Sequence, residues 1–419
     1  MKKILTLFLA AAMALSLFTA CDGGTEDDGS VITVWCEAIG SDNSILQQFK
    51  SYFDENNGMG YTLEYEIKDS LSGDLRAAIQ AGRVPDIVIW PRWETMTRNN
   101  LLQEIDSLVE RDNINIEKYN SEAFKELRAG GKLYGIPTDL DAWGIWCNTD
   151  LTGTENLPKT WDELKTMTAQ LTTGTGTDKI VGLDAYNLRG QFYTFMLTAG
   201  ATFINDGNPP TVNIDISNPN SKSYQDAYAV LTLFEELMNI TGTPADYEQN
   251  EYFMSGKVAM KFGPSNYNKT LKLLTQQEMN LMFIGNPAKS ATEGSISGIV
   301  GGYSLAIPRG ANIEKSWKVI KWWTEKENIS KYCELYELLP ADTTLWDEDF
   351  ITSNVFLSDL KEIIPNYKVR PLVKGYSNFE TTVAFSAMDE LRLKTKTKEQ
   401  VLQYIKTQGD DTFVLENML

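Results

Sequence analysis

The chain contains no histidine at any of its 419 positions. This absence excludes Ser-His-Asp triads and Cys-His dyads, in which an imidazole moves the proton. It also excludes zinc sites with histidine ligands and the iron site built from two histidines and one carboxylate. We therefore expect no catalytic residues of these classes, no metal site and no cofactor.

Cysteine is scarce, with four residues in the chain. Cys36, Cys147 and Cys333 are far apart in the sequence and show no CxxC spacing, so they imply no disulfide framework. A free cysteine commonly behaves as a small buried hydrophobic residue, and we expect this for all three. A chemically active thiol is the alternative.

Positive charge is also in short supply. Lysine and arginine total 38 against 57 aspartates and glutamates, which gives a formal net charge of −19. Such a surface repels nucleic acid and anionic lipid headgroups, and the simplest explanation of the acidity is solubility. The hydrophobic content of 42% is typical of a globular protein. The length favours two domains of ordinary size.

No hydrophobic run is long enough to span a bilayer comfortably, because a spanning helix needs roughly 20 apolar residues. The apolar stretch at 4–18 follows two lysines and precedes two small residues, as in a secretory signal peptide. Cys21 at the cleavage point resembles the bacterial lipobox, although Phe18 stands where leucine is usual. We expect a lipoprotein signal peptide at 1–20, a lipid on Cys21 and an acidic tether at 21–30. The alternative is ordinary secretion without a lipid.

Hydrophobic periodicity after the tether predicts alternating strands and helices, the pattern of parallel α/β units. The first strands are expected at 31–36, 61–67 and 85–90, and the helices between them at 44–54 and 74–81. Later segments continue the mixed pattern. Strands are expected at 143–148, 257–262, 281–284 and 303–307, and helices at 101–110, 223–238, 316–324 and from 377 to the end.

Ligands of open α/β sheets bind beyond the carboxyl ends of the strands. The first candidates are therefore Glu37 after the first strand, and Trp90, Arg92 and Trp93 after the third. Each tryptophan has a core position as its alternative, since large aromatic residues are usually buried. A solvated surface position is the alternative for Arg92.

Six short segments resemble, in family order, the extracellular solute-binding proteins of bacterial carbohydrate transporters, the maltodextrin-binding-like family. Two of them depart from the family pattern: Cys147 and Thr149 replace a tyrosine and a lysine, and Ser265 replaces a tryptophan. The segments are GKLYGIP at 131–137, WGIWCNTDL at 143–151, LPKTWDEL at 157–164, FMSGKVAM with GP at 253–264, GGYSLAIP at 301–308, and LPA at 339–341.

The resemblance implies an α/β fold of two lobes, a periplasmic-binding-protein clamshell with three interlobe crossovers. We place the crossovers near 139–142, 286–294 and 324–331. Lobe one would then hold 31–138 and 295–325, and lobe two 139–294 and 326–419 with the crossovers. The resemblance further implies a monomer that binds a sugar between the lobes and meets an ABC transporter permease.

A sugar offers hydroxyl groups to planar polar side chains and an apolar face to aromatic rings. Residues of these types near the expected crossovers and strand ends are candidates for ligand binding, with turn chemistry or packing as the alternative for each. They are Asp139, Asp141, Trp143, Asn266 with the neighbouring Tyr267, Gly302, Tyr303 and Arg370.

Two functions of different classes remain open on the sequence. A lipid-anchored receptor would bind a sugar or oligosaccharide and pass it to the permease. An anchored glycoside hydrolase would need only a pair of carboxylates, which this acidic chain can supply without histidine. A third possibility keeps the receptor fold and assigns another solute, such as a polyamine, an organic acid or a metal complex.

Overall fold

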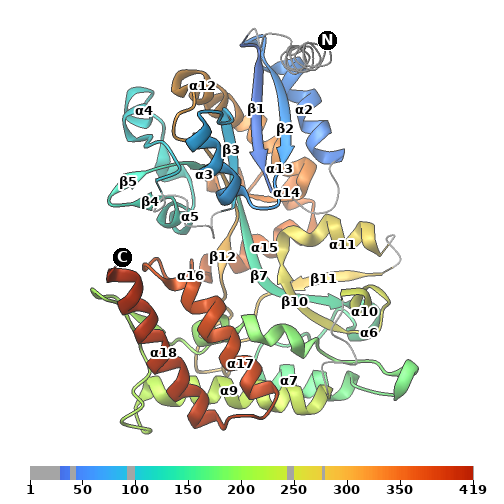
Figure 1. Cartoon of the computed structure of the whole chain (residues 1–419). Helices are drawn as coiled ribbons and strands as arrows, with labels where there is room; N and C mark the ends of the chain where they lie inside the picture. The colour runs from blue at the N-terminus through green and yellow to red at the C-terminus, as the bar shows by residue number, and fades with distance from the viewer. Residues whose placement is uncertain (1–28, 38–43, 92–99, 243–249, 276–278, 419) are drawn as a thin grey trace, which may run out of the picture.

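A computed structural model describes residues 29–37, 44–91, 100–242, 250–275 and 279–418. Cys21, Arg92 and Trp93, which the sequence singled out, lie outside these described residues. The chain forms two lobes stacked one above the other, and the long strand β7 (Asp139–Asn148) runs from the upper lobe into the lower one (Figure 1).

Lobe one is built on a five-stranded sheet with the order β2-β1-β3-β13-β6. The parallel strands are β1 (Val31–Cys36), β2 (Thr62–Ile67) and β3 (Ile87–Pro91). Antiparallel to β3 lies β13 (Tyr303–Ala306), which also pairs with β6 (Ile136–Pro137). The chain therefore returns to lobe one, after building much of lobe two, to complete this sheet.

Helices cover the lobe-one sheet, and their aromatic residues meet in its core. The ring of Phe49 lies 4.6 Å from Trp323 and 5.1 Å from Tyr332, measured between centroids. Tyr332 belongs to α13, so this helix shares the core of lobe one, whereas our division by sequence began lobe two at residue 326. The helices are α2 (Ser44–Asn56), α3 (Leu71–Ala81), α4 (Asp106–Arg111), α5 (Ser121–Glu126), α12 (Ile313–Trp323) and α13 (Lys326–Tyr336).

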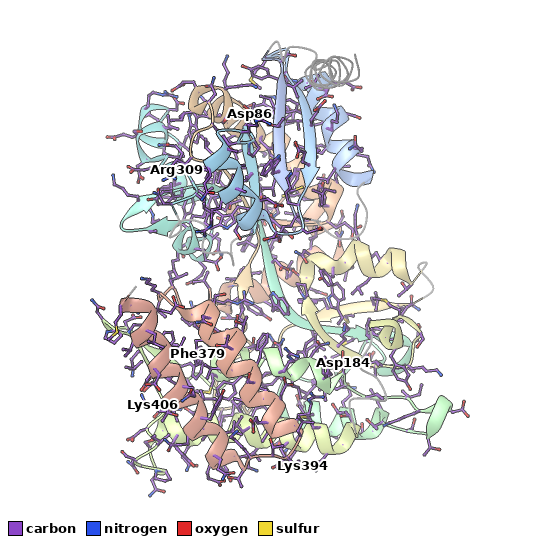
Figure 2. The ribbon with its side chains drawn as sticks, viewed as in Figure 1. Asp86, Asp184, Arg309, Phe379, Lys394 and Lys406 are labelled. Atoms are coloured by element: carbon purple, nitrogen blue, oxygen red, sulfur yellow. The ribbon has the colours of Figure 1, made fainter. Side chains whose placement is uncertain are left out.

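The carboxylate of Asp86 connects α12 to the lobe-one sheet. Asp86 accepts hydrogen bonds from the backbone nitrogen of Thr33 at 2.9 Å and lies 3.3 Å from the ammonium of Lys315 (Figure 2). Because Thr33 is in β1 and Lys315 is in α12, the Asp86 side chain links two segments of lobe one that are far apart in the sequence.

The helix expected at 101–110 is shorter in the structure, since only α4 (Asp106–Arg111) is helical. Leu102 instead forms an antiparallel bridge to Pro308, which follows β13. The apolar residues that suggested a helical face are buried, but as an extended segment beside the sheet. A small hairpin follows, formed by β4 (Arg128–Ala129) and β5 (Lys132–Leu133), with Gly130 and Gly131 at its turn.

Lobe two has a smaller sheet, in which β7 lies between β10 (Met260–Pro264) and β11 (Leu281–Ile284). Long helices form most of this lobe, and Phe379 is fully buried among them, with its ring 5.3 Å from that of Phe413 (Figure 2). The main helices are α7 (Trp161–Leu171), α8 (Phe192–Thr198), α9 (Lys222–Thr241), α17 (Phe385–Arg392) and α18 (Lys398–Met418).

Shorter α-helices and strands lie between these elements. The helices are α6 (Thr149–Thr152), α10 (Asn250–Met254), α11 (Asn268–Leu274), α14 (Asp349–Thr352), α15 (Val355–Ile363) and α16 (Tyr376–Asn378). The strands are β8 (Ile204–Asn205), β9 (Thr211–Val212), β12 (Val300–Gly301) and β14 (Leu339–Pro340).

Three segments lie together where the lobes join. The first two residues of β7 pair with β14, and the next two pair with β12. The range 139–142, which we assigned to the first crossover, is thus the start of β7 and pairs with both of these short strands. The other two assigned ranges, 286–294 and 324–331, precede β12 and β14 in the chain.

The three cysteines of the described residues are free and buried, as expected. Burial raises the pKa of Cys36 and of Cys147 to about 12, with the nearby charge of Glu37 adding to the effect at Cys36. Thiols with such a high pKa hold their protons at neutral pH and are poor nucleophiles. In the described part of the chain, no helix combines the length and apolar character that a membrane span requires.

Candidate functional site

The strand β7 presents two acids and a tryptophan on one face. Alternate residues of a strand point to the same side, so Asp139, Asp141 and Trp143 share a face. Further along that face, Ile145 and Cys147 are in the hydrophobic core of lobe two. The face is therefore polar and aromatic only over the part of β7 that lies at the join between the lobes.

Asp141 is 3% exposed and is held by lobe-two donors. Its Oδ1 accepts a hydrogen bond from the hydroxyl of Ser265 at 2.8 Å and another from the backbone nitrogen of Asn266 at 3.0 Å. Burial raises the pKa of Asp141 to about 6, and the charge of Asp139 adds to this, although the hydrogen bonds oppose it. The carboxyl group can therefore change protonation within an ordinary pH range.

The turn after β10 brings an amide and a phenol beside Asp141. Asn266 has its Oδ1 buried with no hydrogen-bond partner among the described residues. Its neighbour Tyr267 is 44% exposed. Burial, together with the charge of Asp141, raises the pKa of Tyr267. This turn thus offers hydrogen-bonding groups next to the acid.

Tyr303 contributes the lobe-one side of the same region. Its backbone nitrogen donates to Oδ1 of Asp139 at 3.3 Å, and that oxygen also accepts from the hydroxyl of Thr138 at 2.6 Å. Burial raises the pKa of the Tyr303 phenol well above its usual value, and the charges of Asp139 and Asp141 add to it. Gly302 precedes it with a φ of +129°, a backbone conformation that favours glycine.

Glu37 lies at the carboxyl end of β1, as expected, but its carboxylate has a local partner. Its Oε1 accepts a hydrogen bond from the backbone nitrogen of Leu71 at 3.4 Å, at the first turn of α3. Negative charge is favourable at a helix N-terminus. Glu37 therefore helps to hold α3, and it also contributes to the negative charge near Tyr303.

Arg370 lies beside Trp143. The centre of its guanidinium is 6.0 Å from the centroid of the Trp143 ring, within the range of a cation–π interaction. Its Nε is 3.4 Å from Oε2 of Glu380. Although burial opposes it, the nearby carboxylates of Glu380 and Glu126 raise the pKa of Arg370, so this side chain stays charged.

The structure thus gathers seven of the expected residues at the join between the lobes, with Glu37 at the margin. They are Asp139, Asp141, Trp143, Asn266, Gly302, Tyr303 and Arg370. Trp90 has no exposed surface and belongs to the core of lobe one. We leave it out of the proposed ligand contacts for this reason. Arg92 and Trp93 lie outside the described residues.

Sequence reasoning did not single out Ser265 or Glu380. Ser265 is visible in the sequence only as a departure from the family motif, in which a tryptophan is usual. Glu380 follows Arg370 closely in the chain, but no motif in the sequence indicates that the two side chains pair. The contact of Arg370 with Trp143 joins distant parts of the chain and depends on the tertiary fold. Within the described residues, no group of three or more aspartate, glutamate or cysteine side chains could hold a metal ion.

The family model described as bacterial extracellular solute-binding protein matches residues 40–329. This range covers more than half of the chain, including most of lobe one, the strands β7, β10 and β11 and the site residues from Asp139 to Tyr303. The chain therefore belongs to that family. Members of the family act outside the cytoplasm as binding proteins, not as enzymes.

Similar proteins extend over nearly the whole chain. Binding proteins of Brucella abortus strain 2308 and Brucella suis biovar 1 are each 23% identical to it over 421 residues, which cover 96% of this chain and 96% of the relative. Their likeness therefore includes both lobes.

Solved structures show the same fold at low sequence identity. The sugar-binding protein MalE from Xanthomonas citri has a TM-score of 0.75 at 17% identity, covering 93% of this chain and 98% of that one. An ABC transporter solute-binding protein from Thermotoga lettingae, bound with α-D-tagatose, has a TM-score of 0.73 at 17% identity, with coverages of 92% and 100%. The family and the two-lobed fold expected from the short motifs are confirmed.

Proposed function

We propose that this protein is an extracytoplasmic receptor that binds a sugar or oligosaccharide between its lobes and delivers it to an ABC transporter permease. The observation that carries the proposal is the shared face of β7, where Asp141 and Trp143 lie two residues apart at the join between the lobes. A carboxylate can bind sugar hydroxyls while an indole ring packs against the apolar face of the same sugar.

Neighbouring groups suit the same ligand chemistry. Asn266 and Tyr267 add an amide and a phenol beside Asp141, and Arg370 adds a planar cation beside Trp143. Solved structures of the same fold include one bound to maltotriose, the MalE domain from Bdellovibrio bacteriovorus, with a TM-score of 0.71 and 17% identity over 91% of this chain and 99% of that one. These likenesses support a sugar as the ligand class.

A thermal-shift screen tests this proposal, since a ligand that binds only the folded state raises its melting temperature. The panel should contain maltotriose, mannotriose and D-tagatose, with a polyamine and an organic acid as other solutes. For a sugar that binds, we expect Asp141→Asn and Trp143→Ala each to weaken affinity by roughly tenfold or more.

The matched control is Asp411→Asn, an exposed acid on α18, which should bind as the wild type does. Equal affinity of all three variants would show that this face of β7 does not touch the ligand. Stabilisation by the polyamine or the organic acid alone would show that the ligand is another solute and not a sugar.

The glycoside hydrolase remains as the second candidate, supported by the paired acids Asp139 and Asp141 on one strand face. Incubation of the protein with the sugars that bind separates the two functions. We expect stoichiometric binding with no product, whereas turnover would establish the enzyme.

The proposed receptor is a monomer held to the membrane by a lipid on Cys21. The motif around that residue carries this part of the proposal, because a Cys at the end of a short secretory leader is the site of acylation in bacterial lipoproteins. Cys21→Ser should release the protein from membranes or leave it unprocessed, as read by fractionation. Unchanged membrane association would contradict the lipid anchor.

A further inference from the structure

The segment 368–370 lies against the crossover strand β12 and carries Arg370 to the site. The backbone nitrogen of Lys368 donates to the carbonyl of Gly298 at 3.0 Å, and the nitrogen of Val300 donates to the carbonyl of Lys368 at 2.9 Å. Lys368 therefore forms an isolated parallel bridge with Ile299, on the side of residues 298–300 that faces away from β7.

A residue of lobe one holds the same segment. Glu122, on α5, accepts a hydrogen bond from the backbone nitrogen of Val369 at 3.3 Å through Oε2. Its other oxygen is 3.4 Å from the ammonium of Lys368 and 2.7 Å from that of Lys125. The side chain of Glu122 is only 11% exposed.

The lobe-two side of the segment has its own attachments. The hydroxyl of Tyr193, from α8, donates to the carbonyl of Val369 at 3.4 Å, and Glu380 pairs with Arg370. Val369 is therefore bonded through its nitrogen to lobe one and through its carbonyl oxygen to lobe two. The next residue, Arg370, lies against Trp143.

We propose that Glu122 is a positioning residue, which ties α5 of lobe one to the segment that places Arg370 beside Trp143. This inference rests on the proposed binding function. Because Glu122 moves with lobe one, Arg370 keeps its place at Trp143 only in an arrangement of the lobes that preserves the bond to Val369. Ligand affinity is thereby coupled to lobe arrangement through a residue that does not itself touch the site.

A comparison of backgrounds tests the inference, using whichever of maltotriose, mannotriose and D-tagatose binds the wild type. Glu122→Ala should weaken binding by about three- to tenfold, a usual size for coupling through intermediate residues. Glu122→Gln keeps an acceptor for Val369 and should restore part of the affinity. In an Arg370→Gln background, Glu122→Ala should change affinity by less than about twofold, because its effect passes through Arg370.

The control is Glu117→Gln, an exposed acid just before α5, which should bind the probe as the wild type does. An equal loss from Glu122→Ala with and without Arg370 would overturn the inference, because it would show that Glu122 supports the fold in general.

Hydrogen exchange measured without any sugar separates this inference from the proposed function. The peptide containing Val369 should exchange faster in Glu122→Ala than in the wild type, while Glu117→Gln leaves it unchanged. Unchanged exchange in Glu122→Ala would overturn the attachment even if a sugar binds. Faster exchange in Glu122→Ala, together with no binding of any tested sugar by the wild type, would support the contact between Glu122 and Val369 and contradict the proposed sugar receptor.

Discussion

Asp141 is nearly fully buried, and burial raises its pKa from 3.8 to about 6. The folded state therefore holds this proton more tightly than the unfolded chain does. The resulting stabilisation is complete below the pKa of the unfolded state and is lost as pH rises through about 6. At neutral pH the folded protein retains a buried negative charge that does not favour folding.

Replacing Asp141 by the neutral asparagine should raise the free energy of unfolding at pH values where the negative charge opposes folding. Asp141→Asn keeps an oxygen for Ser265 and Asn266, and at pH 7.5 we expect it to increase the free energy of unfolding by on the order of 1–3 kcal/mol. At pH 4 the gain should be small, because the native carboxyl is protonated there. Thermal unfolding at both pH values measures the effect, with Asp411→Asn as the control. A variant less stable than the wild type at pH 7.5 would show that the charge supports the fold.

Gly298 is packed against the backbone of Trp143 at a position with no room for a side chain. A Cβ there would meet Nδ2 of Asn286 at 2.6 Å, a ring carbon of Tyr367 at 2.6 Å and the carbonyl oxygen of Trp143 at 2.9 Å. Gly298→Ala should therefore lower the free energy of unfolding by about 1–3 kcal/mol, measured in urea. Gly190→Ala, whose Cβ would make only an ordinary contact with Phe385, should be nearly neutral.

Among the elements, α7 begins with a complete capping box. The hydroxyl of Thr160 accepts a hydrogen bond from the backbone nitrogen of Glu163, and the carboxylate of Glu163 accepts one from the nitrogen of Thr160. Thr160→Ala should cost about 1 kcal/mol of stability. Sugar affinity should not change, because α7 contributes no residue to the site. A change in sugar affinity, measured under conditions in which the variant is fully folded, would show that α7 takes part in binding.

Local sequence predicted the elements well where burial follows a simple period. The strand at 31–36 has the predicted bounds, and the capping box of α7 was visible as a threonine followed three residues later by a glutamate. The predicted helix was wrong at Leu101 and Leu102, because a buried extended segment and the buried face of a helix can contain the same apolar residues. Trp90 is buried because helices cover the lobe-one sheet, so even the end of β3 is core.

The site was predictable only in part, for a related reason. Asp141 and Trp143 could be chosen because two residues of spacing place them on one strand face. The bond between Glu122 and Val369 joins distant parts of the chain, and no local pattern indicates it. Contacts of this kind depend on how the lobes meet, and only the folded structure shows them.

For the whole molecule, we expect the lobes to approach each other when ligand binds, because a ligand that contacts both lobes stabilises the closed arrangement. Small-angle scattering should show a smaller radius of gyration with a saturating sugar. Trp143→Ala, at the same sugar concentration, should show a smaller decrease. An unchanged radius with a sugar proved to bind at the site would contradict a hinged receptor.

The strand order of lobe one also has a consequence for how the protein folds. Ile89 in β3 pairs with Leu305 in β13, so this sheet cannot be completed until the chain of lobe two that lies between them has been synthesised. Pairing between such distant segments is slow, because the intervening loop must close first. In the proposed exported receptor, lobe one would stay incomplete until β13 has been made. A precursor in that state would remain competent for export.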